Sequence, residues 1–343
     1  MMHVILWFSI VLASAAEPYA CGDWVRVQVP QAREPIRDLQ IHQGTEGTVH
    51  ALWYSPNLGT SSAAQWNRTR WRVDTLGQGR GDMAVVDDVP YVALTHCGDE
   101  DCAVSYGWRE ESSWSMREAI RVTGPLSPPS LVLGTDGQPH VVYGATVGDA
   151  SMMMHASTPH GAWHVSELYT GSTHLGPPDL SVRRSGALDM VFTDASDGGR
   201  ILHGEYVDTS WTVSETSLTR GRSARIHWGS IDAPYIGYFR KGQRVAVKTR
   251  DGQWVDYGHP HAGTGPFDVD SRGAPHFLLT VDAPPLKRLE WVRWTGSSWV
   301  RELVAADPQG FSAYALTLTP AGCPLVLYQH AGAAKTVFAR AGL

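Results

Sequence analysis

The stretch TDGQPHVVYG, Thr135–Gly144, combines a tight turn with the start of an apolar strand. A close copy, SRGAPHFLLT, follows 136 residues later at Ser271–Thr280. In both copies Gly permits the positive φ of a turn, and Pro suits the first residue of a strand, where no ladder N–H is needed. We therefore expect the His after each Pro to be a residue of the turn and strand start rather than a metal ligand, and we expect His140 to be partly exposed.

The turn-and-strand unit recurs along the chain. Short alternating apolar runs are separated by Gly, Asp, Ser and Pro turns, and long amphipathic helical patterns are missing. Between Ser130 and Leu168 the fullest unit holds four strands, SLVLGT, PHVVYGA, MMMHAS and WHVSEL. Four short strands that repeat with a period in the forties are typical of a β-propeller blade.

Tryptophan supports the same period. In six successive units a Trp follows a short polar turn and opens the fourth strand, at intervals of 43 to 49 residues: Trp71, Trp114, Trp163, Trp211, Trp254 and Trp299. Because blades diverge toward the rim, large rings fill the space between neighbouring sheets. We interpret the series as packing between blades. The alternative is a ring of sugar-stacking aromatics, but the pattern follows strand position rather than loop position.

The seventh unit lacks its fourth strand. It contains YALTLT, PLVLYQHA and TVFARAGL, whereas the N-terminal strand DWVRVQV, Asp23–Val29, has no partner strand beside it in the sequence. We therefore predict an all-β fold, a seven-bladed β-propeller of four-stranded antiparallel blades in which the N-terminal strand completes the last blade. This closure satisfies the edges that an open sheet would expose.

The first residues indicate export. An apolar run from Val4 to Ala13 is followed by Ser14 and Ala15, which is typical of a secretory signal peptide and its cleavage site. We predict a signal peptide at 1–15, a single propeller domain at 16–343, and a secreted or periplasmic protein without a transmembrane segment. The alternatives are a buried strand or a membrane anchor, but the run is shorter than the roughly 20 apolar residues that span a bilayer.

Four cysteines in an exported chain favour disulfide bonds. Cys97 and Cys102 flank GDED at the tip of a hairpin in the second blade, so we expect them to pair. Cys21 precedes the closing strand and Cys323 lies in the first turn of the seventh blade. Because the predicted closure brings these two segments to one face, we expect a bond between Cys21 and Cys323. The alternative is four reduced cysteines in a cytosolic protein.

The wording D-G-x-P-H-V-x-Y at Asp136–Tyr143 resembles repeats of secreted bacterial propellers of the sialidase-like, BNR-repeat kind. A sialidase Asp-box reads S-x-D-x-G-x-x-W, but STPHGAW, Ser157–Trp163, has Pro in place of Asp and its Trp one residue early. REPIRD, Arg33–Asp38, is not the F-R-I-P segment of sialidases, which have six blades. The resemblance therefore implies a propeller fold and does not imply sialidase catalysis.

Several first strands are expected to open with a polar residue at an equivalent place. The second-to-third-strand loops and the inter-blade connections share one face of a propeller, here called the loop face, and these residues should lie at the channel mouth on that face: Asp38, Asp82, Ser130, Asp179, Arg225 and Asp268. Four carboxylates there would suit a polyhydroxyl ligand or a hard cation such as Ca²⁺. The alternative is that each Asp caps a strand end or bonds a neighbouring turn.

Further polar and aromatic residues fall in or beside loops of this face: His96, His174, His259, His261, His330, Tyr54, Tyr169, Tyr257 and Phe311. The segment HPH makes His259 and His261 candidate ligand contacts. No zinc motif, P-loop, dinucleotide fingerprint or nucleophile elbow occurs, so we assign no metal site and no catalytic residue. A pair of glycosidase carboxylates is neither identified nor excluded by the sequence.

The formal charge is −6 at pH 7 and Lys and Arg are scattered, so the chain lacks the clustered basic face that nucleic-acid binding needs. We predict an exported, monomeric binding or scaffold module that recognises a glycan or a protein ligand at the loop face without catalysis and without a resident cofactor. One alternative is a carbohydrate-active enzyme, a glycosidase or polysaccharide lyase with acids on the same face. The other is a purely structural surface protein.

Overall fold

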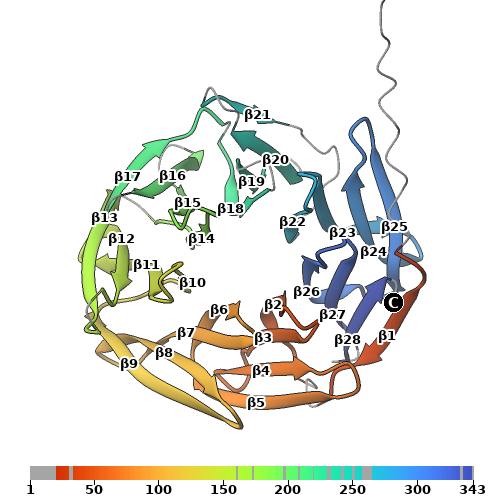
Figure 1. Ribbon diagram of the computed structural model, residues 1–343, viewed down its shortest axis with the longest axis horizontal. Helices are drawn as coiled ribbons and strands as arrows, with labels where there is room; N and C mark the ends of the chain where they lie inside the picture. The colour runs from red at the N-terminus through yellow and green to blue at the C-terminus, as the bar shows by residue number, and fades with distance from the viewer. Residues whose placement is uncertain are drawn as a thin grey trace, which may run out of the picture.

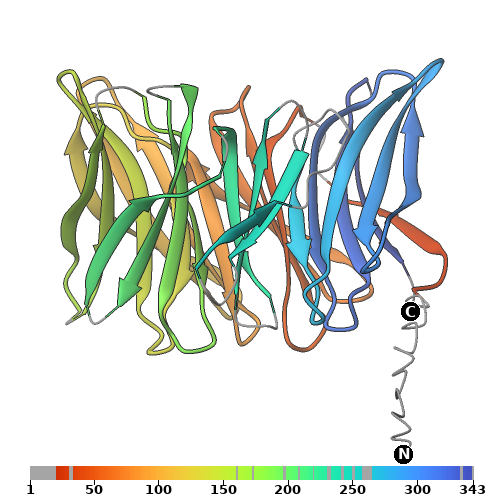
Figure 2. The ribbon, with the colours of Figure 1, turned by 90° about the horizontal axis from the view of Figure 1, so that it is seen from above.

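The computed structural model describes residues 21–30, 34–159, 161–171, 174–195, 198–207, 209–218, 220–229, 233–240, 243–248, 252–256, 265–332 and 335–341. Its strands form seven four-stranded antiparallel sheets, arranged as the blades of a closed ring (Figure 1). Figure 2 shows the ring from its edge. The predicted seven-bladed, all-β propeller is confirmed. The described residues include no helix long and apolar enough to cross a membrane.

The first three blades follow one another along the chain. Blade 1 contains β2 (Arg37–Gln43), β3 (Val49–Ser55), β4 (Thr60–Trp66) and β5 (Trp71–Gln78). Blade 2 contains β6 (Arg80–Val86), β7 (Val89–Cys97), β8 (Asp101–Glu110) and β9 (Ser113–Thr123). Blade 3 contains β10 (Ser130–Leu133), β11 (Pro139–Val147), β12 (Ala150–Ser157) and β13 (His164–Gly171).

The next three blades repeat the order from the channel to the rim. Blade 4 contains β14 (Asp179–Val182), β15 (Leu188–Asp194), β16 (Arg200–Val207) and β17 (Ser210–Glu215). Blade 5 contains β18 (Arg222–Trp228), β19 (Pro234–Phe239), β20 (Gln243–Lys248) and β21 (Trp254–Asp256). Blade 6 contains β22 (Phe267–Val269), β23 (Pro275–Ala283), β24 (Leu286–Trp294) and β25 (Trp299–Asp307).

Blade 7 closes the ring with strands from both ends of the described chain: β26 (Phe311–Leu318), β27 (Pro324–His330), β28 (Lys335–Ala341) and β1 (Trp24–Gln28). Strand β1 pairs antiparallel with β28, so the predicted closing strand is confirmed. A side chain of the same blade secures the entry to blade 1. Gln329 Oε1 accepts the Ile36 N–H at 3.0 Å, and Gln329 Nε2 donates to the Glu34 carbonyl at 2.8 Å.

The repeated turn behaves as its sequence indicates. Gly137 and Gly273 have φ values of 75° and 81°, a region that costs Gly little and other residues more. Strands β11 and β23 then begin at the Pro of each quoted stretch. The turn therefore sets the start of the second strand, and with it the register of the blade.

The histidines that follow these prolines are buried, and the expectation of partial exposure is wrong. His140 is 8% exposed, because its ring stacks on His155 and Tyr206 of the next blade packs against its edge. His276 is 0% exposed and its Nδ1 accepts a hydrogen bond from Trp291 Nε1 at 3.1 Å. These positions belong to the core between blades.

The outer tryptophans pack across the boundaries between blades. In five blades the ring contacts a third-strand ring of the preceding blade, with centroids 5.5 to 6.4 Å apart: Trp24–Trp291, Trp71–Phe338, Trp163–Tyr106, Trp211–His155 and Trp254–His203. Trp114 and Trp299 belong to clusters that likewise include residues of the preceding blade. The packing interpretation of the Trp series is confirmed.

Both predicted disulfide bonds are present. Cys21 bonds to Cys323, with Cα atoms 5.5 Å apart, and Cys97 bonds to Cys102, with Cα atoms 3.9 Å apart. The first bond joins the segment before β1 to the turn between β26 and β27, so it holds the closing strand beside its own blade. Such bonds persist in oxidising compartments.

Candidate functional site

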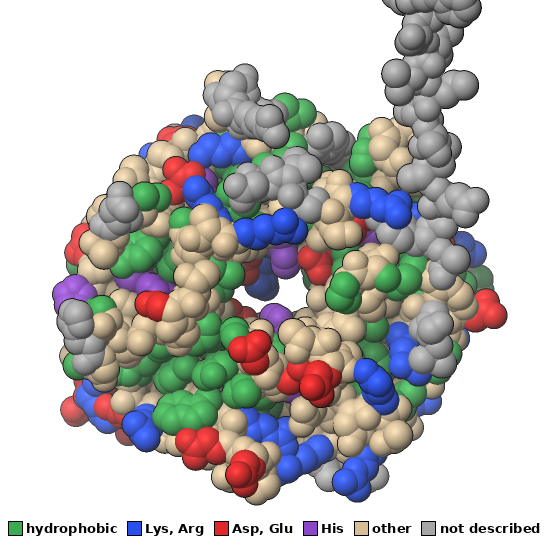
Figure 3. Space-filling view, viewed as in Figure 1, with side chains coloured by type: hydrophobic (Ala, Val, Ile, Leu, Met, Phe, Trp, Pro, Cys, Tyr) green, Lys and Arg blue, Asp and Glu red, His purple; other side chains and the backbone are tan. Residues whose placement is uncertain are grey.

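The innermost strands of the seven blades surround a central channel with a volume of about 740 Å³. Figure 3 shows its opening at the centre of the ring, with basic, acidic and His side chains in the wall. The charged candidates on inner strands all line it: Asp38, Asp82, Asp179, Arg225 and Asp268. His259 and His261 lie outside the described residues. Whether any of these residues contacts a ligand stays a prediction.

Strand register corrects which of these residues are equivalent. Asp82, Asp179 and Arg225 take the place that Ser130 holds opposite Val142 in blade 3. Asp38 and Asp268 do not. The equivalent residue is Gln40 in blade 1, Pro266 in blade 6 and Ala315 in blade 7. Asp38 lies two residues before it, and Asp268 two residues after it.

The shared place has a structural role in four consecutive blades. Its side chain accepts a backbone N–H from the inner strand of the next blade, a contact we call the inter-blade tie. The ties are Gln40 Oε1 with Met83 N at 3.0 Å, Asp82 Oδ2 with Leu131 N at 2.8 Å, Ser130 Oγ with Leu180 N at 2.9 Å, and Asp179 Oδ2 with Ile226 N at 2.6 Å. Through these ties Asp82 and Asp179 each bond the next blade, which is the alternative raised above.

The two acids out of register also bond the inner strand of the next blade, through different residues. Asp38 receives two hydrogen bonds from the Arg80 guanidinium, at 2.5 and 3.0 Å. Asp268 accepts the Leu318 N–H at 2.9 Å and lies 3.4 Å from His227 Nδ1. Because cations or backbone donors already satisfy these carboxylates, the geometry gives no support to the Ca²⁺ hypothesis.

Four of the candidates form one electrostatic cluster. Arg225 Nη1 lies 3.0 Å from Asp179 Oδ1, and the charges of Asp179, Asp82 and Asp38 raise the pKa of Arg225. Burial in the channel wall raises the pKa of Asp82 to about 6, and the charge of Asp179 adds to the rise. The cluster therefore combines one arginine cation with three carboxyl groups, and the pKa of one of them, Asp82, is raised to about 6.

Asp82 allows the structural role to be measured. Asp82→Ala removes the acceptor of the Leu131 N–H, and we expect the free energy of unfolding to fall by about 1–3 kcal/mol because a buried donor loses its partner. Asp82→Asn keeps an oxygen at that place and should retain most of the stability. Chemical denaturation at pH 7 measures both variants.

The pH dependence provides the control. Since the Asp82 pKa rises from 3.8 to about 6 on folding, the folded protein holds this proton more tightly than the unfolded chain. The group therefore favours folding in acid, and its contribution declines as the pH rises from about 4 to about 6. Asp82→Asn does not titrate, so its stability relative to the unsubstituted protein should improve across this window. A difference that does not change with pH would contradict the assignment.

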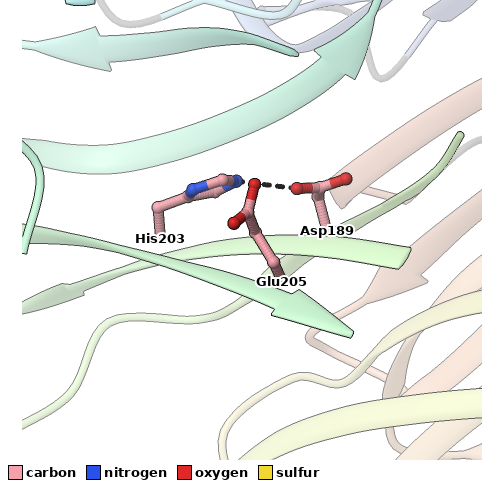
Figure 4. Close-up of side chains that lie close together, drawn as sticks. All are labelled: Asp189, His203 and Glu205. Carbon is pink, nitrogen blue, oxygen red and sulfur yellow. Dashed lines mark hydrogen bonds and ion pairs between the residues drawn. The ribbon is translucent and has the colours of Figure 1, made fainter. Parts of the chain in front are cut away.

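A second polar cluster lies between blades 4 and 5, and sequence analysis missed it. Asp189, His203 and Glu205 converge there (Figure 4), with donor atoms within 4.8 Å of one another and His203 Nε2 2.8 Å from Asp189 Oδ1. Arg183 donates to both carboxylates at 2.6 to 2.8 Å, and Lys248 donates to Glu205 at 3.1 Å. These side chains occupy the place a metal cation would need. One feature of the sequence pointed to this cluster: Asp189 stands at the second residue of its strand, where blades 3 and 6 have His140 and His276.

No family model and no curated protein matches the sequence, but solved structures match the fold. A polysaccharide lyase of the PL25 family, an ulvan lyase bound to -[GlcA(1-4)Rha3S]-, has a TM-score of 0.68 at 11% identity and covers 91% of this chain and 95% of that chain. A lectin from Aleuria aurantia in complex with Fucalpha1-6GlcNAc has a TM-score of 0.54 at 14% identity, with coverages of 80% and 96%.

The GH93 α-L-arabinofuranosidase of Fusarium graminearum has a TM-score of 0.52 at 11% identity, with coverages of 92% and 96%. At these identities the likeness establishes the fold alone. The structural neighbours therefore include a polysaccharide lyase, a lectin and a glycosidase. The resemblance to sialidase-type repeats is not confirmed.

Proposed function

We propose that this protein is a non-catalytic module that binds a glycan at the loop-face mouth of its central channel. The charge cluster of Asp38, Asp82, Asp179 and Arg225 carries the proposal, because it lines a channel of about 740 Å³. That volume falls within the range of small-molecule sites, about 300–1,000 Å³. Carboxylates accept hydrogen bonds from sugar hydroxyls. A guanidinium donates hydrogen bonds to sugar oxygens from a planar group.

We also propose that the protein works outside the cytoplasm, in the periplasm or beyond the cell. Two disulfide bonds support this location. The apolar N-terminal run followed by small residues supports it as well. A lyase and a lectin among the fold neighbours agree with a glycan as the ligand.

A glycan array identifies the ligand, and Arg225→Gln then tests the site. The side chain of Arg225 is 58% exposed, so its removal should change the melting temperature little. We expect the dissociation constant of the array-selected glycan to rise by about tenfold or more, because a charged hydrogen-bond donor is lost. Arg117→Gln, an exposed arginine on β9, is the matched control and should bind normally. Unchanged binding in Arg225→Gln would overturn the channel site.

A carbohydrate-active enzyme is the second candidate, because two carboxyls of the channel have different surroundings. Burial raises the pKa of Asp82 to about 6, whereas Asp179 Oδ1 lies 3.0 Å from the Arg225 guanidinium. Glycosidases use one protonated and one ionised carboxyl. Incubation of each bound glycan, followed by mass spectrometry, decides between the two. If the unsubstituted protein yields a cleavage product, and Asp82→Asn binds the glycan but yields none, the protein is an enzyme.

A further inference from the structure

A second cavity, of about 510 Å³, lies between blades 6 and 7. Strand β27 ends and β28 begins beside it, so it opens on the loop face. The closing strand β1 and the end of β25 complete its wall. The side chains relevant to binding are Arg26, Gln28, Tyr328, His330 and Lys335. None of them belongs to the innermost strands, so the cavity is separate from the central channel.

Two cations in this wall have no carboxylate partner among the residues that the structure describes. Within the described part of the chain, neither Arg26 nor Lys335 forms an ion pair, and both residues are exposed. Arg26 Nη2 donates to the Val304 carbonyl at 2.7 Å, which fixes the guanidinium across the boundary between blades 6 and 7. Strand pairing places Lys335 opposite His330. The cavity wall therefore presents two cationic side chains to an anionic ligand.

The acid next to this wall is already engaged. Asp307 Oδ2 lies 2.8 Å from His330 Nδ1, and Asp307 Oδ1 accepts the N–H groups of Gln309 and Gly310. These contacts fix the His330 ring. They also hold the carboxylate in its turn, so it is bonded elsewhere rather than to Arg26 or Lys335.

Aromatic rings give the cavity a firm wall. The centroids of Tyr328 and His330 are 5.3 Å apart, and Phe311 packs against both rings at 5.6 Å. Tyr328 is 2% exposed. Burial raises the pKa of its phenol, and Arg26 beside it opposes the rise. A packed aromatic cluster beside two cations, of which Arg26 is fixed by its hydrogen bond, suits a ligand with both a ring and a negative charge.

We propose that this cavity binds an anionic sugar unit of an oligosaccharide, through a uronate carboxylate or a sulfate ester held by Arg26 and Lys335. A planar guanidinium matches both anions with two parallel hydrogen bonds. The volume is that of an organic ligand and exceeds what an inorganic anion fills. The argument is independent of the channel site, and either site can fail without the other.

Isothermal titration of the purified, oxidised protein tests the proposal with four probes: trigalacturonate, a heparin tetrasaccharide, neutral maltotetraose and inorganic sulfate. We expect one or both anionic oligosaccharides to bind, with affinity that falls as NaCl rises from about 50 to about 500 mM. Arg26→Gln with Lys335→Gln should weaken binding by about tenfold for each cation removed. If the double variant does not fold, the single variant Lys335→Gln, at an exposed residue, replaces it in the titration.

The control separates this cavity from bulk charge. Arg70→Gln with Arg117→Gln removes the same charge from blades 1 and 2 and should leave binding intact. Equal loss in this control, unchanged binding in the Arg26 and Lys335 variant, or inorganic sulfate that binds as tightly as the oligosaccharides would overturn the proposal. Binding of trigalacturonate shows that a carboxylate is sufficient, whereas binding of the heparin tetrasaccharide alone indicates that sulfate is needed.

Discussion

Replacement of Cys21 and Cys323 by serine is expected to lower the free energy of unfolding by up to about 5 kcal/mol. The bond joins residues 302 apart in sequence, and in the chain-entropy model the stabilisation grows with the length of the closed loop. The loss should also release β1, because Cys21 directly precedes it. Urea denaturation measures the first effect, and hydrogen exchange of the β1 amides measures the second.

The second disulfide is the internal control. Cys97 and Cys102 are five residues apart, so their removal should cost only about 2 kcal/mol by the same model. Exchange at β1 should not respond to it. If the two double variants lose equal stability, or if β1 stays protected without Cys21, then the long-range bond does not secure the ring.

Trp71→Ala should cost about 3–5 kcal/mol, the range for truncation of a buried aromatic side chain. Trp71 is 8% exposed. Its ring centroid lies 5.6 Å from that of Trp66 in the same blade and 5.5 Å from that of Phe338 across the boundary with blade 7. The cavity left there would open the boundary where the ring closes. Thermal denaturation by circular dichroism is the measurement.

Trp163→Ala is the matched control, since this Trp holds the same place in its repeat but is partly exposed. It still contacts Tyr106 at 5.6 Å, so we expect a smaller loss of stability than for Trp71→Ala. Equal losses of stability at both sites would show that the exposure of an outer tryptophan does not determine how much it stabilises the fold.

The repeat made the fold predictable, because most blades share the same local chemistry. A turn Gly with positive φ, a Pro that begins the second strand and a Trp near the fourth strand recur at a period that only a propeller explains. Trp71, Trp254 and Trp299 do begin their strands, whereas Trp163 lies one residue before β13. The closing strand was predictable because the repeat was short by one strand at one end of the chain and long by one at the other.

The candidate site was only partly predictable, because sequence spacing does not reveal a bulge. The register of β2 shifts between Arg37 and Gln40, which displaces Asp38 from the place that Asp82 holds. In blade 6 the equivalent residue is Pro266, so Asp268 is the acid there although it lies further along the chain. The inter-blade ties join residues about 40 to 50 apart, and no local pattern identifies them.

The cavity between blades 6 and 7 was beyond sequence reasoning for a similar reason. Arg26 and Lys335 come from opposite ends of the chain and line one cavity only because β1 pairs with β28. His330 and Phe311 were recognised as residues beside the loops, but nothing in the sequence placed a cation next to them.

The pairing of β1 with β28 also has a consequence for the order of events during synthesis. Among the described strands β1 is the first to be made and β28 the last, while the strands of blades 1 to 6 find their partners in the next hairpin. The earliest strand therefore waits with unpaired edges while six blades assemble, and such edges are where separate chains adhere. A circularly permuted gene that places β1 after β28 would remove that delay, so the yield of folded protein would then depend less on how many chains are being made at once.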